Sequence, residues 1–540
     1  MPKTKIIIFI CLLVYFAIFN FLRNSYLLTT ILDDAYIFFR YAENIVNGNG
    51  FVWNIGEAPV EGYTSFLYLF ALIIAKFLSF DLEVFAILFG TVTSAFTLYF
   101  SYLIYNHLYP HDQVKTPSNI LTIIILALSP AFAYWSGAGM ETSFYSMFLV
   151  MTIYYFLKLP DSVRNNLSKG ILFGLLCLLR FEAVLFFLVA LYYFLKEDKS
   201  FFKMKINRNP ILFVTGFTII FGIYFVWRWS HFGYFFPNTF YAKTGGGFQQ
   251  ITGGFLYIIK ALRLFYGFGW IPIILVMLYF RQSMISGKAF FLFSIGLVSL
   301  LTTILIGGDH FHLGRFVLPV FPLLFILFPP ALNKMLTTQI KHLNLKPIFR
   351  TAVLLVFVTA LLVAKPVYQD AINGFKNLLE GKKETLVVYD ESSEREIIDW
   401  QHGFIIMGSS LNQISKKDEY IACVPIGAIG YYSKMKVIDM VGIVDPVIAH
   451  EKLSADHLIK WTPGHTKGDG KYILSRKPEY IQLTDYLTNS PLEKPHKRSL
   501  QFTSVREIWD SEEFHNEYEF YPVEVIDGWY YNLFKRKSVN

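Results

Sequence analysis

The stretch MPKTKIIIFICLLVYFAIFNFLRNSYLLTTILDDAYIFFRY (residues 1–41) contains two features that predict the architecture of the whole chain. An apolar run lies between Lys5 and Arg23, and a pair of acidic residues, Asp33-Asp34, follows it. The run is long enough to cross a bilayer. It resembles a signal peptide, but no cleavage site of small residues follows. We therefore predict an uncleaved first membrane helix whose basic end lies in the cytoplasm.

The composition extends this prediction to the whole chain. Of 540 residues, 54% are hydrophobic and only 16% are charged, whereas about 25% are charged in ordinary soluble domains. A soluble enzyme, a disordered chain and a disulfide scaffold are excluded. The net charge of +8 is typical of Lys and Arg retained in cytoplasmic loops. No basic patch with interleaved aromatic residues is present, so we expect no nucleic-acid partner.

Further apolar runs predict a polytopic α-helical membrane protein. Two runs are ambiguous, at 64–80 and 170–195. The positive-inside rule favours an interfacial 64–80 and a hairpin over 170–195, because Arg164 and Lys169 then stay in the cytoplasm. The hairpin also keeps two charges, Arg180 and Glu182, out of the middle of the bilayer. Both alternatives give about eleven spans. The clear runs lie at about 83–105, 119–135, 142–158, 210–230, 254–280, 288–306, 315–333 and 348–366.

The C-terminal third of the chain has a different pattern. It is charged, interrupted by Gly and Pro, and contains short alternating runs at 419–425 and 436–439. Such runs are typical of a mixed α/β domain. We predict a membrane domain over residues 1–369 and an extracytoplasmic α/β domain over residues 370–540. The N-terminus is then in the cytoplasm and the C-terminal domain outside.

On this topology the unusual polar residues lie on the outer side, in loops at 30–82, 136–141, 231–253 and 307–314 and at the tip of the 170–195 hairpin. Their clustering at one face predicts an interfacial active site, whereas a transport pathway places polar residues near helix midpoints. The candidate residues of the membrane domain are Asp33, Asp34, Arg40, Glu61, Tyr63, Glu141, Arg180, Glu182, Lys243, Asp309, His310, His312 and Arg315.

Each candidate also has a simpler interpretation. The Asp pair is either a solvated helix end or, because like charges raise one pKa, a general base or metal ligand. His310 and His312 point to opposite faces of an extended segment, which favours hydrogen bonding or phosphate contact over metal binding. Arg315 either snorkels or binds a lipid-linked phosphate. Arg180 with Glu182 is either functional or a structural ion pair, and Lys243 either functions or snorkels.

Several motifs together resemble a known family, the polyprenyl-phosphate-sugar-dependent glycosyltransferases of the GT-C architecture. The closest pattern is that of the mycobacterial terminal arabinofuranosyltransferase and the LphB-type membrane proteins. The matching motifs are DDAYIxxRY (33–41), GFVWN (50–54), VEGYTS (60–65), GMET (139–142), PNTFYAK (237–243), GGD…GRF (307–316), IGYYS…VIDMVGIVDPVIAH (429–450), GHTK (464–467) and LSRKPEY (474–480).

The resemblance implies a helix bundle whose first outer loop carries the acidic catalytic residue, capped by an outer α/β domain. It implies a sugar donor on a polyprenyl phosphate, an envelope polysaccharide or glycolipid acceptor, and a bacterial cytoplasmic (inner) membrane. Some GT-C enzymes need a divalent cation, such as Mg²⁺ or Mn²⁺. The sequence offers no clear trio of metal ligands, so the metal and its site stay unknown.

We therefore expect Asp33 or Asp34 to act as general base on an acceptor hydroxyl. Arg315, Lys243 and Arg180 are expected to stabilise the leaving lipid phosphate, with His310 or His312 as hydrogen-bond donors. The other candidates are expected to contact the sugar or acceptor, or to shape the pocket. Asp445, His450 and His465 of the outer domain either line the acceptor groove or have structural roles. The alternative function is a non-enzymatic flippase for lipid-linked sugars, which places charges deep in the spans.

Overall fold

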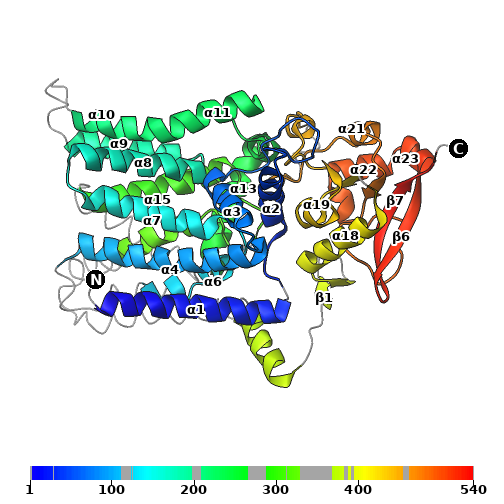
Figure 1. The fold of residues 1–540 in the computed structure, drawn as a ribbon, viewed down its shortest axis with the longest axis horizontal. Coiled ribbons are helices and arrows are strands. Elements are labelled where there is room, and N and C mark those ends of the chain that lie inside the picture. Colours follow the sequence, from blue (N-terminus) through cyan, green and yellow to red (C-terminus); the bar gives the residue numbers. More distant parts are fainter. Residues whose placement is uncertain are drawn as a thin grey trace.

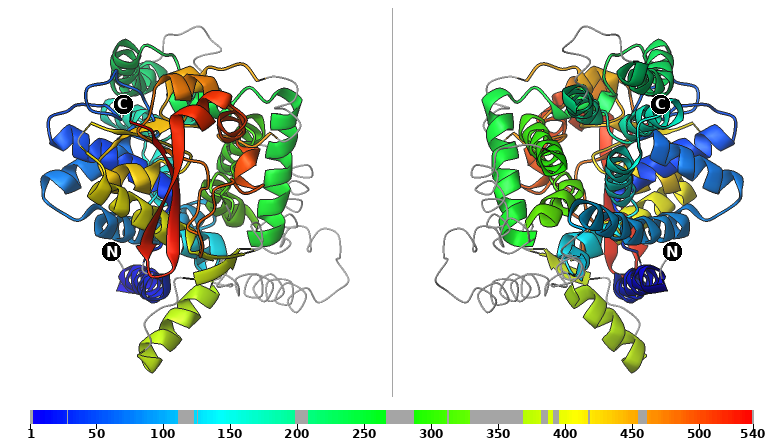
Figure 2. Two further views of the ribbon diagram at one scale, coloured as in Figure 1. Left: turned by 90° about the vertical axis from the view of Figure 1, so that its right-hand side faces the viewer. Right: turned by 90° about the vertical axis from the view of Figure 1, so that its left-hand side faces the viewer.

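A computed structural model of the chain describes residues 3–27, 29–110, 123–124, 126–197, 208–265, 287–311, 313–328, 368–381, 387–390, 395–416, 418–453 and 461–538. A bundle of long helices forms one half of the molecule, and a domain built on a β-sheet covers one end of it (Figure 1, Figure 2). The chain is thus a polytopic α-helical membrane protein with a C-terminal α/β domain, as the sequence predicts.

The bundle is formed by helices that run roughly parallel or antiparallel to one another (Figure 1), except that α13 (Gly247–Phe265) runs across the others (Figure 2). They are α1 (Lys3–Leu27), α4 (Leu82–Leu108), α6 (Pro130–Trp135), α7 (Thr142–Lys158), α8 (Val163–Leu179), α9 (Ala183–Glu197), α10 (Arg208–Phe217), α11 (Ile223–Phe232), α13 (Gly247–Phe265) and α15 (Lys288–Leu305). A π-helical turn, η3 (Thr218–Gly222), joins α10 and α11 into one long helix, and η4 (Leu318–Val320) follows α15. Three short helices, α2 (Asp33–Val46), α3 (Phe66–Phe77) and α12 (Asn238–Lys243), lie in the connecting loops.

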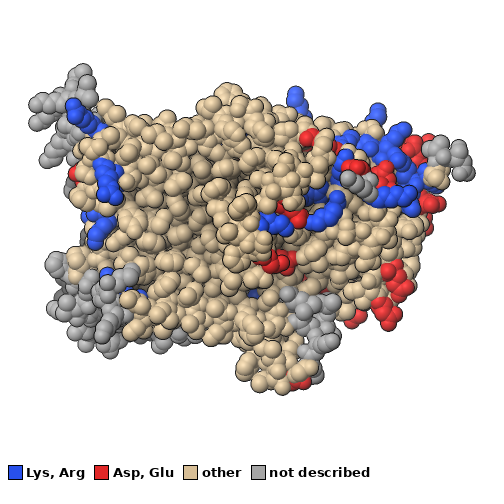
Figure 3. All heavy atoms as spheres, in the orientation of Figure 1, with Lys and Arg blue, Asp and Glu red and all other residues tan. Residues whose placement is uncertain are grey.

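Four helices of the described residues are long and apolar enough to cross a membrane: Lys5–Tyr26, Leu82–Leu108, Arg208–Phe232 and Lys288–Leu305. The bundle shows hardly any charged side chains along its middle on the face drawn in Figure 3, and charges gather over the C-terminal domain. Parts of the predicted runs at 119–135, 254–280 and 315–333, and all of 348–366, lie outside the described residues. The total of about eleven spans therefore stays a prediction.

The structure describes both ambiguous runs. In the 170–195 run the chain breaks at 180–182, between α8 and α9, as the hairpin prediction requires. In the 64–80 run only the 12 residues of α3 are helical. At 1.5 Å per residue they span about 18 Å, well short of the roughly 30 Å of bilayer hydrocarbon. The short α3 therefore favours the interfacial alternative.

The C-terminal domain contains a five-stranded sheet of order β4-β3-β5-β7-β6. Strands β3 (Tyr420–Cys423), β4 (Lys436–Asp439) and β5 (Tyr480–Gln482) are parallel, and β6 (Tyr518–Ile526) and β7 (Trp529–Arg536) add an antiparallel hairpin. Strands β3 and β4 coincide with the two alternating runs of the sequence. A separate hairpin pairs β1 (Val387–Asp390) with β2 (Arg395–Ile398). The helical elements are α18 (Trp400–Ile414), α19 (Gly427–Ser433), α20 (Pro446–Ala449), α21 (Gly470–Ser475), η6 (Ser499–Gln501), α22 (Thr503–Trp509) and α23 (Glu512–Glu517).

Buried polar contacts join the first loop to the C-terminal domain. Arg40, on α2, donates to the carbonyls of Gly430 (2.7 Å) and Met435 (2.8 Å) and stacks on Trp53. The Asn54 amide donates to the carbonyl of Val437 (3.0 Å). Because these groups are buried, losing either partner would leave an unsatisfied polar atom. Arg40 therefore fixes one domain to the other.

A second buried contact fixes the first loop to the bundle. The carboxylate of Glu61 accepts hydrogen bonds from Nε and Nη2 of Arg228 on α11. The exposed fraction is 3% for Glu61 and 1% for Arg228. Arg228 also donates to the carbonyl of Phe235 (2.8 Å), in the segment that leads into α12. Glu61 thus holds two loops in place.

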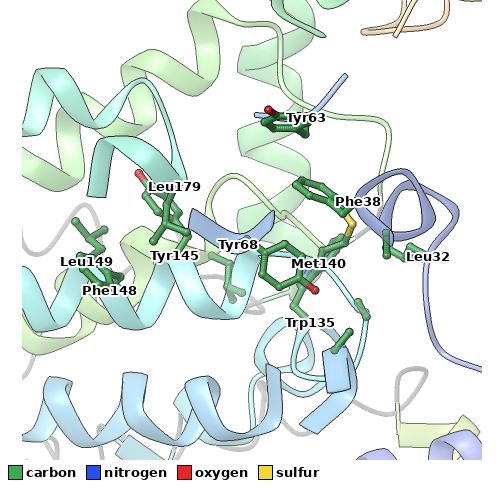
Figure 4. Close-up of a cluster of buried hydrophobic side chains, with 14 of the residues drawn as sticks. Leu32, Phe38, Tyr63, Tyr68, Trp135, Met140, Tyr145, Phe148, Leu149 and Leu179 are labelled. Atoms are coloured by element: carbon green, nitrogen blue, oxygen red, sulfur yellow. The ribbon is translucent and has the colours of Figure 1, made fainter. Parts of the chain in front are cut away.

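Apolar and aromatic side chains of the first loop pack with those of the bundle in one buried cluster (Figure 4). Phe38 of α2 packs edge-on against Tyr68 of α3, with ring centroids 5.3 Å apart. The Tyr68 hydroxyl donates to the carbonyl of Gly139 (2.6 Å), beside Met140. Two loops distant in sequence, 30–82 and 136–141, therefore share one core at the end of the bundle that carries the C-terminal domain.

Candidate active site

A cavity of about 1120 Å³ lies between this end of the bundle and the C-terminal domain. It brings together ten of the predicted site residues: Asp33, Asp34, Tyr63, Glu141, Arg180, Glu182, Lys243, His310, Arg315 and His465. Arg40, Glu61, Asp309, Asp445 and His450 do not line it. His312 lies outside the described residues. Residues from every predicted outer loop thus meet in one cavity.

The two residues of the acidic pair have different surroundings. Both oxygens of the Asp33 carboxylate accept backbone hydrogen bonds from the start of α19, from Gly427 N (3.0 Å) and Ala428 N (2.7 Å). Position 427 requires glycine, because a Cβ there would lie 1.9 Å from the Asp33 carbonyl oxygen. Burial raises the pKa of Asp33 to about 7, against the effect of the two N–H groups. Asp33 therefore serves the contact between domains.

Asp34 is the accessible member of the pair. Its side chain is 29% exposed, and its Oδ2 lies 3.7 Å from Nη1 of Arg315. It has no side-chain hydrogen bond to another residue that the structure describes. A carboxylate that lines a cavity and is not occupied by protein donors can accept a proton from a bound molecule.

Arg315 and Arg180 are held by carboxylates on the same wall. Arg315 Nε lies 2.7 Å from Asp309 Oδ2, and the two side chains are 5% and 2% exposed. Although burial opposes it, the Arg315 guanidinium lowers the pKa of Asp309 to about 2. Arg180 Nε lies 2.8 Å from Glu182 Oε1, and Arg180 Nη1 lies 3.3 Å from Glu141 Oε1. Both guanidinium groups are thereby held in place before any ligand binds.

Lys243 differs from these arginines. It ends the short helix α12 and lines the cavity, and no hydrogen bond or ion pair links its ammonium group to any described residue. Burial, together with the nearby Arg315 charge, lowers the pKa of Lys243. A partly buried cation without a counter-ion is poised to gain from a bound anion.

Two histidines close the same region from opposite domains. The rings of His310 and His465 lie 4.4 Å apart, and His310 Nδ1 lies 3.4 Å from Asp309 Oδ1. Burial lowers the pKa of both residues, and each of them lies near the Lys243 charge. Neutral imidazoles can donate one hydrogen bond and accept another. The cation-rich part of the cavity is thus contacted by residues of both domains.

The remaining predicted residues of the C-terminal domain have structural contacts. Asp445 caps α20, accepting from Val447 N (2.9 Å) and Ile448 N (3.3 Å). The His450 ring lies against two tyrosines of the 231–253 loop, Tyr234 (4.4 Å) and Tyr241 (4.2 Å). Asp445 thus stabilises its own domain, His450 supports the contact between the domains, and neither residue lines the cavity.

The carboxylates do not suit a metal ion as they stand. Among the described residues no three His, Cys, Asp or Glu side chains are grouped as metal ligands would be. Asp309, Glu141 and Glu182 each have an arginine as partner. The arginines thus occupy the positions beside these three carboxylates that a metal cation would take.

Apart from His465, none of the residues of the C-terminal domain that line the cavity was predicted from the sequence as a site residue. Trp400, Gln401, Asp485, Arg498, Gln501 and Arg506 all line the cavity. They come from α18, the segment between β5 and η6, η6 itself and α22, which together extend over more than 100 residues of the sequence. No motif marks these residues, so only the folded domain brings them together.

The shifted pKa of Asp33 predicts a pH-dependent stability. The carboxyl group holds its proton to about pH 7 in the folded chain but loses it near pH 4 when unfolded. The folded state therefore binds more protons between these values, and stability falls as pH rises from about 4.5 to 7. We expect the thermal midpoint of the purified protein to fall by at least ~2 °C over this range relative to Asp33→Asn. Parallel curves for the two proteins would contradict this expectation.

Comparisons with known proteins identify solved structures that have a similar fold. Residues 394–528 match the family model DUF8728, a domain of unknown function. No curated protein matches. The structure of ArnT from Cupriavidus metallidurans bound to undecaprenyl phosphate is similar at 10% identity and a TM-score of 0.51, over 81% of this chain and 86% of that one. Its apo form gives the same identity and TM-score, over 80% and 85%.

A third similar structure is the archaeal oligosaccharyltransferase AglB from Archaeoglobus fulgidus in complex with an inhibitory peptide and a dolichol-phosphate. Its identity is 11% and its TM-score 0.48, over 89% of this chain and 69% of that one. ArnT and AglB are GT-C glycosyltransferases, and the likeness to ArnT shows that this chain has the same fold. The finer resemblance to the mycobacterial arabinofuranosyltransferase and the LphB-type proteins stays a prediction.

Proposed function

We propose that this chain is an integral-membrane glycosyltransferase. It moves a sugar from a polyprenyl-phosphate donor to an envelope glycan or glycolipid on the outer face of the bacterial inner membrane. The observation that carries the proposal is the cavity at the end of an apolar bundle, where an accessible carboxylate, Asp34, lies beside Arg315, Lys243 and Arg180. The undecaprenyl phosphate in the ArnT structure supports this choice of donor.

The cations suit the leaving group. When the sugar leaves its donor, the bond between the anomeric carbon and the phosphate oxygen breaks, and that oxygen keeps the electron pair. Lys243, which has no counter-ion among the described residues, and Arg315, which is held by Asp309, can stabilise the resulting phosphate. Fixed cations in a partly buried site stabilise developing charge without having to rearrange.

Asp34 suits the role of general base. The acceptor hydroxyl attacks the anomeric carbon and transfers its proton to the Asp34 carboxylate as the new glycosidic bond forms. Asp33 is the less suitable base, because backbone N–H groups already occupy both of its oxygens. We assign Asp33 to the positioning of Asp34, its neighbour in the first turn of α2.

The test is transfer of labelled sugar from a panel of polyprenyl-phosphate donors, in membranes that contain wild type, Asp34→Asn or Asp33→Asn. Transfer by wild type that Asp34→Asn abolishes, with donor binding kept, supports the proposal. Binding of donors without transfer, in the presence of crude envelope acceptors, would contradict it and favour a lipid-linked sugar flippase.

Lys243 gives a separate prediction on donor affinity. A hydrogen bond to a charged group contributes about 1.5–3 kcal/mol. We therefore expect Lys243→Gln to weaken binding of the donor phosphate at least tenfold, measured as the Kd of a polyprenyl phosphate. Lys452→Gln is the control, because Lys452 is exposed and does not line the cavity. Equal Kd values for both variants would remove Lys243 from the phosphate site.

A further inference from the structure

We propose that the C-terminal domain is the acceptor-binding half of the site and that the acceptor it holds is a carbohydrate chain. This inference rests on the proposed function and gives a role to the segment that matches a domain of unknown function. All residues of this domain that line the cavity, from Trp400 to Arg506, fall within the matched range of 394–528.

The wall contributed by the domain is continuous with the cation-rich region. His465 contacts His310 of the bundle, and the His465 ring lies 5.8 Å from the ring of Phe502. Next to Phe502, the Thr503 hydroxyl donates to the carbonyl of Thr466 (2.9 Å). A ligand that begins beside Asp34 can therefore extend along η6 and α22 without leaving the cavity.

The donor leaves this wall free. Its lipid tail must stay in the membrane, so its phosphate binds at the bundle, where Arg315, Lys243 and Arg180 lie. Drug-sized ligands occupy pockets of about 300–1,000 Å³, and this cavity measures 1120 Å³. A sugar phosphate therefore leaves room for a second, extended ligand against the C-terminal domain.

The side chains of this wall suit a carbohydrate. Phe502 offers a ring against which the C–H face of a sugar can stack, and Trp400, with one face covered by Arg498, adds further aromatic surface to the wall. Gln401 and Gln501 offer amide groups, while the Arg498 guanidinium lies over Trp400 at 4.1 Å and is paired with Asp390 (Nη1–Oδ2 3.3 Å). The Gln401 Oε1 atom is buried and lacks a hydrogen-bond partner among the described residues. A buried acceptor atom of this kind costs free energy until a donor reaches it, and a sugar hydroxyl is such a donor.

Other acceptors suit this wall less well. A lipid acceptor requires a mainly apolar groove, whereas polar and charged side chains alternate with rings here. A peptide bound as an added strand requires an exposed sheet edge. The described lining residues of this domain come instead from helices and from loops that follow strands.

The first experiment identifies the acceptor class with full-length wild type, labelled donor and crude cell envelopes. We expect the label in water-soluble, protease-resistant material that glycosidases shorten. Label released by protease, or label in lipid without a glycan, would overturn the inference while leaving the proposed function intact. Absence of any transfer, with Asp34→Asn indistinguishable from wild type, would instead overturn the proposed function.

The second experiment tests the wall by titrating the labelled glycan fraction against two variants. We expect Gln401→Ala and Arg506→Ala to raise the apparent KM for this fraction at least tenfold. The Kd for a polyprenyl phosphate should change less than twofold. Gln413→Ala, exposed on the same helix as Gln401, and Lys471→Ala, exposed on α21, are the matched controls. An unchanged acceptor KM, or an equal loss of affinity for donor and acceptor, would overturn the assignment.

Discussion

Replacing Asp34 with asparagine is expected to lower the rate of sugar transfer by about 10²–10⁴-fold, the range that a positioned general base contributes. The amide keeps the shape of the side chain but cannot accept the proton of the acceptor hydroxyl. Because Asp34 lies 3.7 Å from Arg315, its loss should leave the phosphate-binding cations in place. The measurement is the single-turnover rate at saturating donor, together with the Kd for a polyprenyl phosphate.

Asp33→Asn is the matched control, because the two residues adjoin and differ in their contacts. The amide oxygen that this substitution leaves can still accept one backbone hydrogen bond from the start of α19. We therefore expect a smaller loss of rate and a changed pH dependence of stability. Asp34→Glu should recover part of the activity, since it restores a carboxylate. If Asp33→Asn lost more activity than Asp34→Asn at equal donor affinity, the assignment of the base would be reversed.

Replacing Arg228 with methionine is expected to destabilise the protein by about 3–5 kcal/mol, the cost of leaving one member of a buried ion pair without its partner. Arg228 is 1% exposed, and Glu61 would keep a buried charge with Tyr224 as its remaining side-chain donor. Because Glu61 and Phe235 anchor two cavity loops through Arg228, the variant should also lose activity. Thermal or denaturant unfolding in detergent measures the change.

Two further variants test whether the loss of stability arises because the ion pair is buried. Arg476→Met removes the partner of Glu57, and both of those side chains are more than one quarter exposed. The expected cost is below about 1 kcal/mol, as for surface ion pairs. The double variant Glu61→Gln with Arg228→Met removes the uncompensated charge and should be more stable than Arg228→Met alone. An equal cost for Arg228→Met and Arg476→Met would contradict the prediction.

Much of the architecture follows from local sequence. Apolar runs of spanning length predict the bundle helices, because a segment that crosses the lipid must be apolar and must satisfy its backbone hydrogen bonds within a helix. The hairpin break at Arg180-Phe-Glu182 follows from the cost of placing charges in the bilayer, and α8 and α9 are separated there. The alternating runs that became β3 and β4 were recognisable by their period of two.

The functional site, like the fold, is predictable from the sequence only in part. The loops that supply its charged residues are predictable from the sequence, because polar groups confined to one side of a membrane have one face on which to meet. The sequence did not determine which of two adjacent aspartates stays accessible. That depended on Gly427 and Ala428, almost 400 residues away, whose N–H groups occupy Asp33.

The role of Glu61 and the residues of the cavity wall in the C-terminal domain likewise depend on contacts between segments distant in sequence. From the sequence Glu61 is a candidate sugar-binding residue, but in the structure its carboxylate is bound by Arg228, 167 residues further along the chain. Trp400, Gln401 and Arg506 carry no local pattern that places them at a cavity. Hydropathy and period act between near neighbours in sequence, whereas ion pairing and cavity lining depend on segments that only folding brings together.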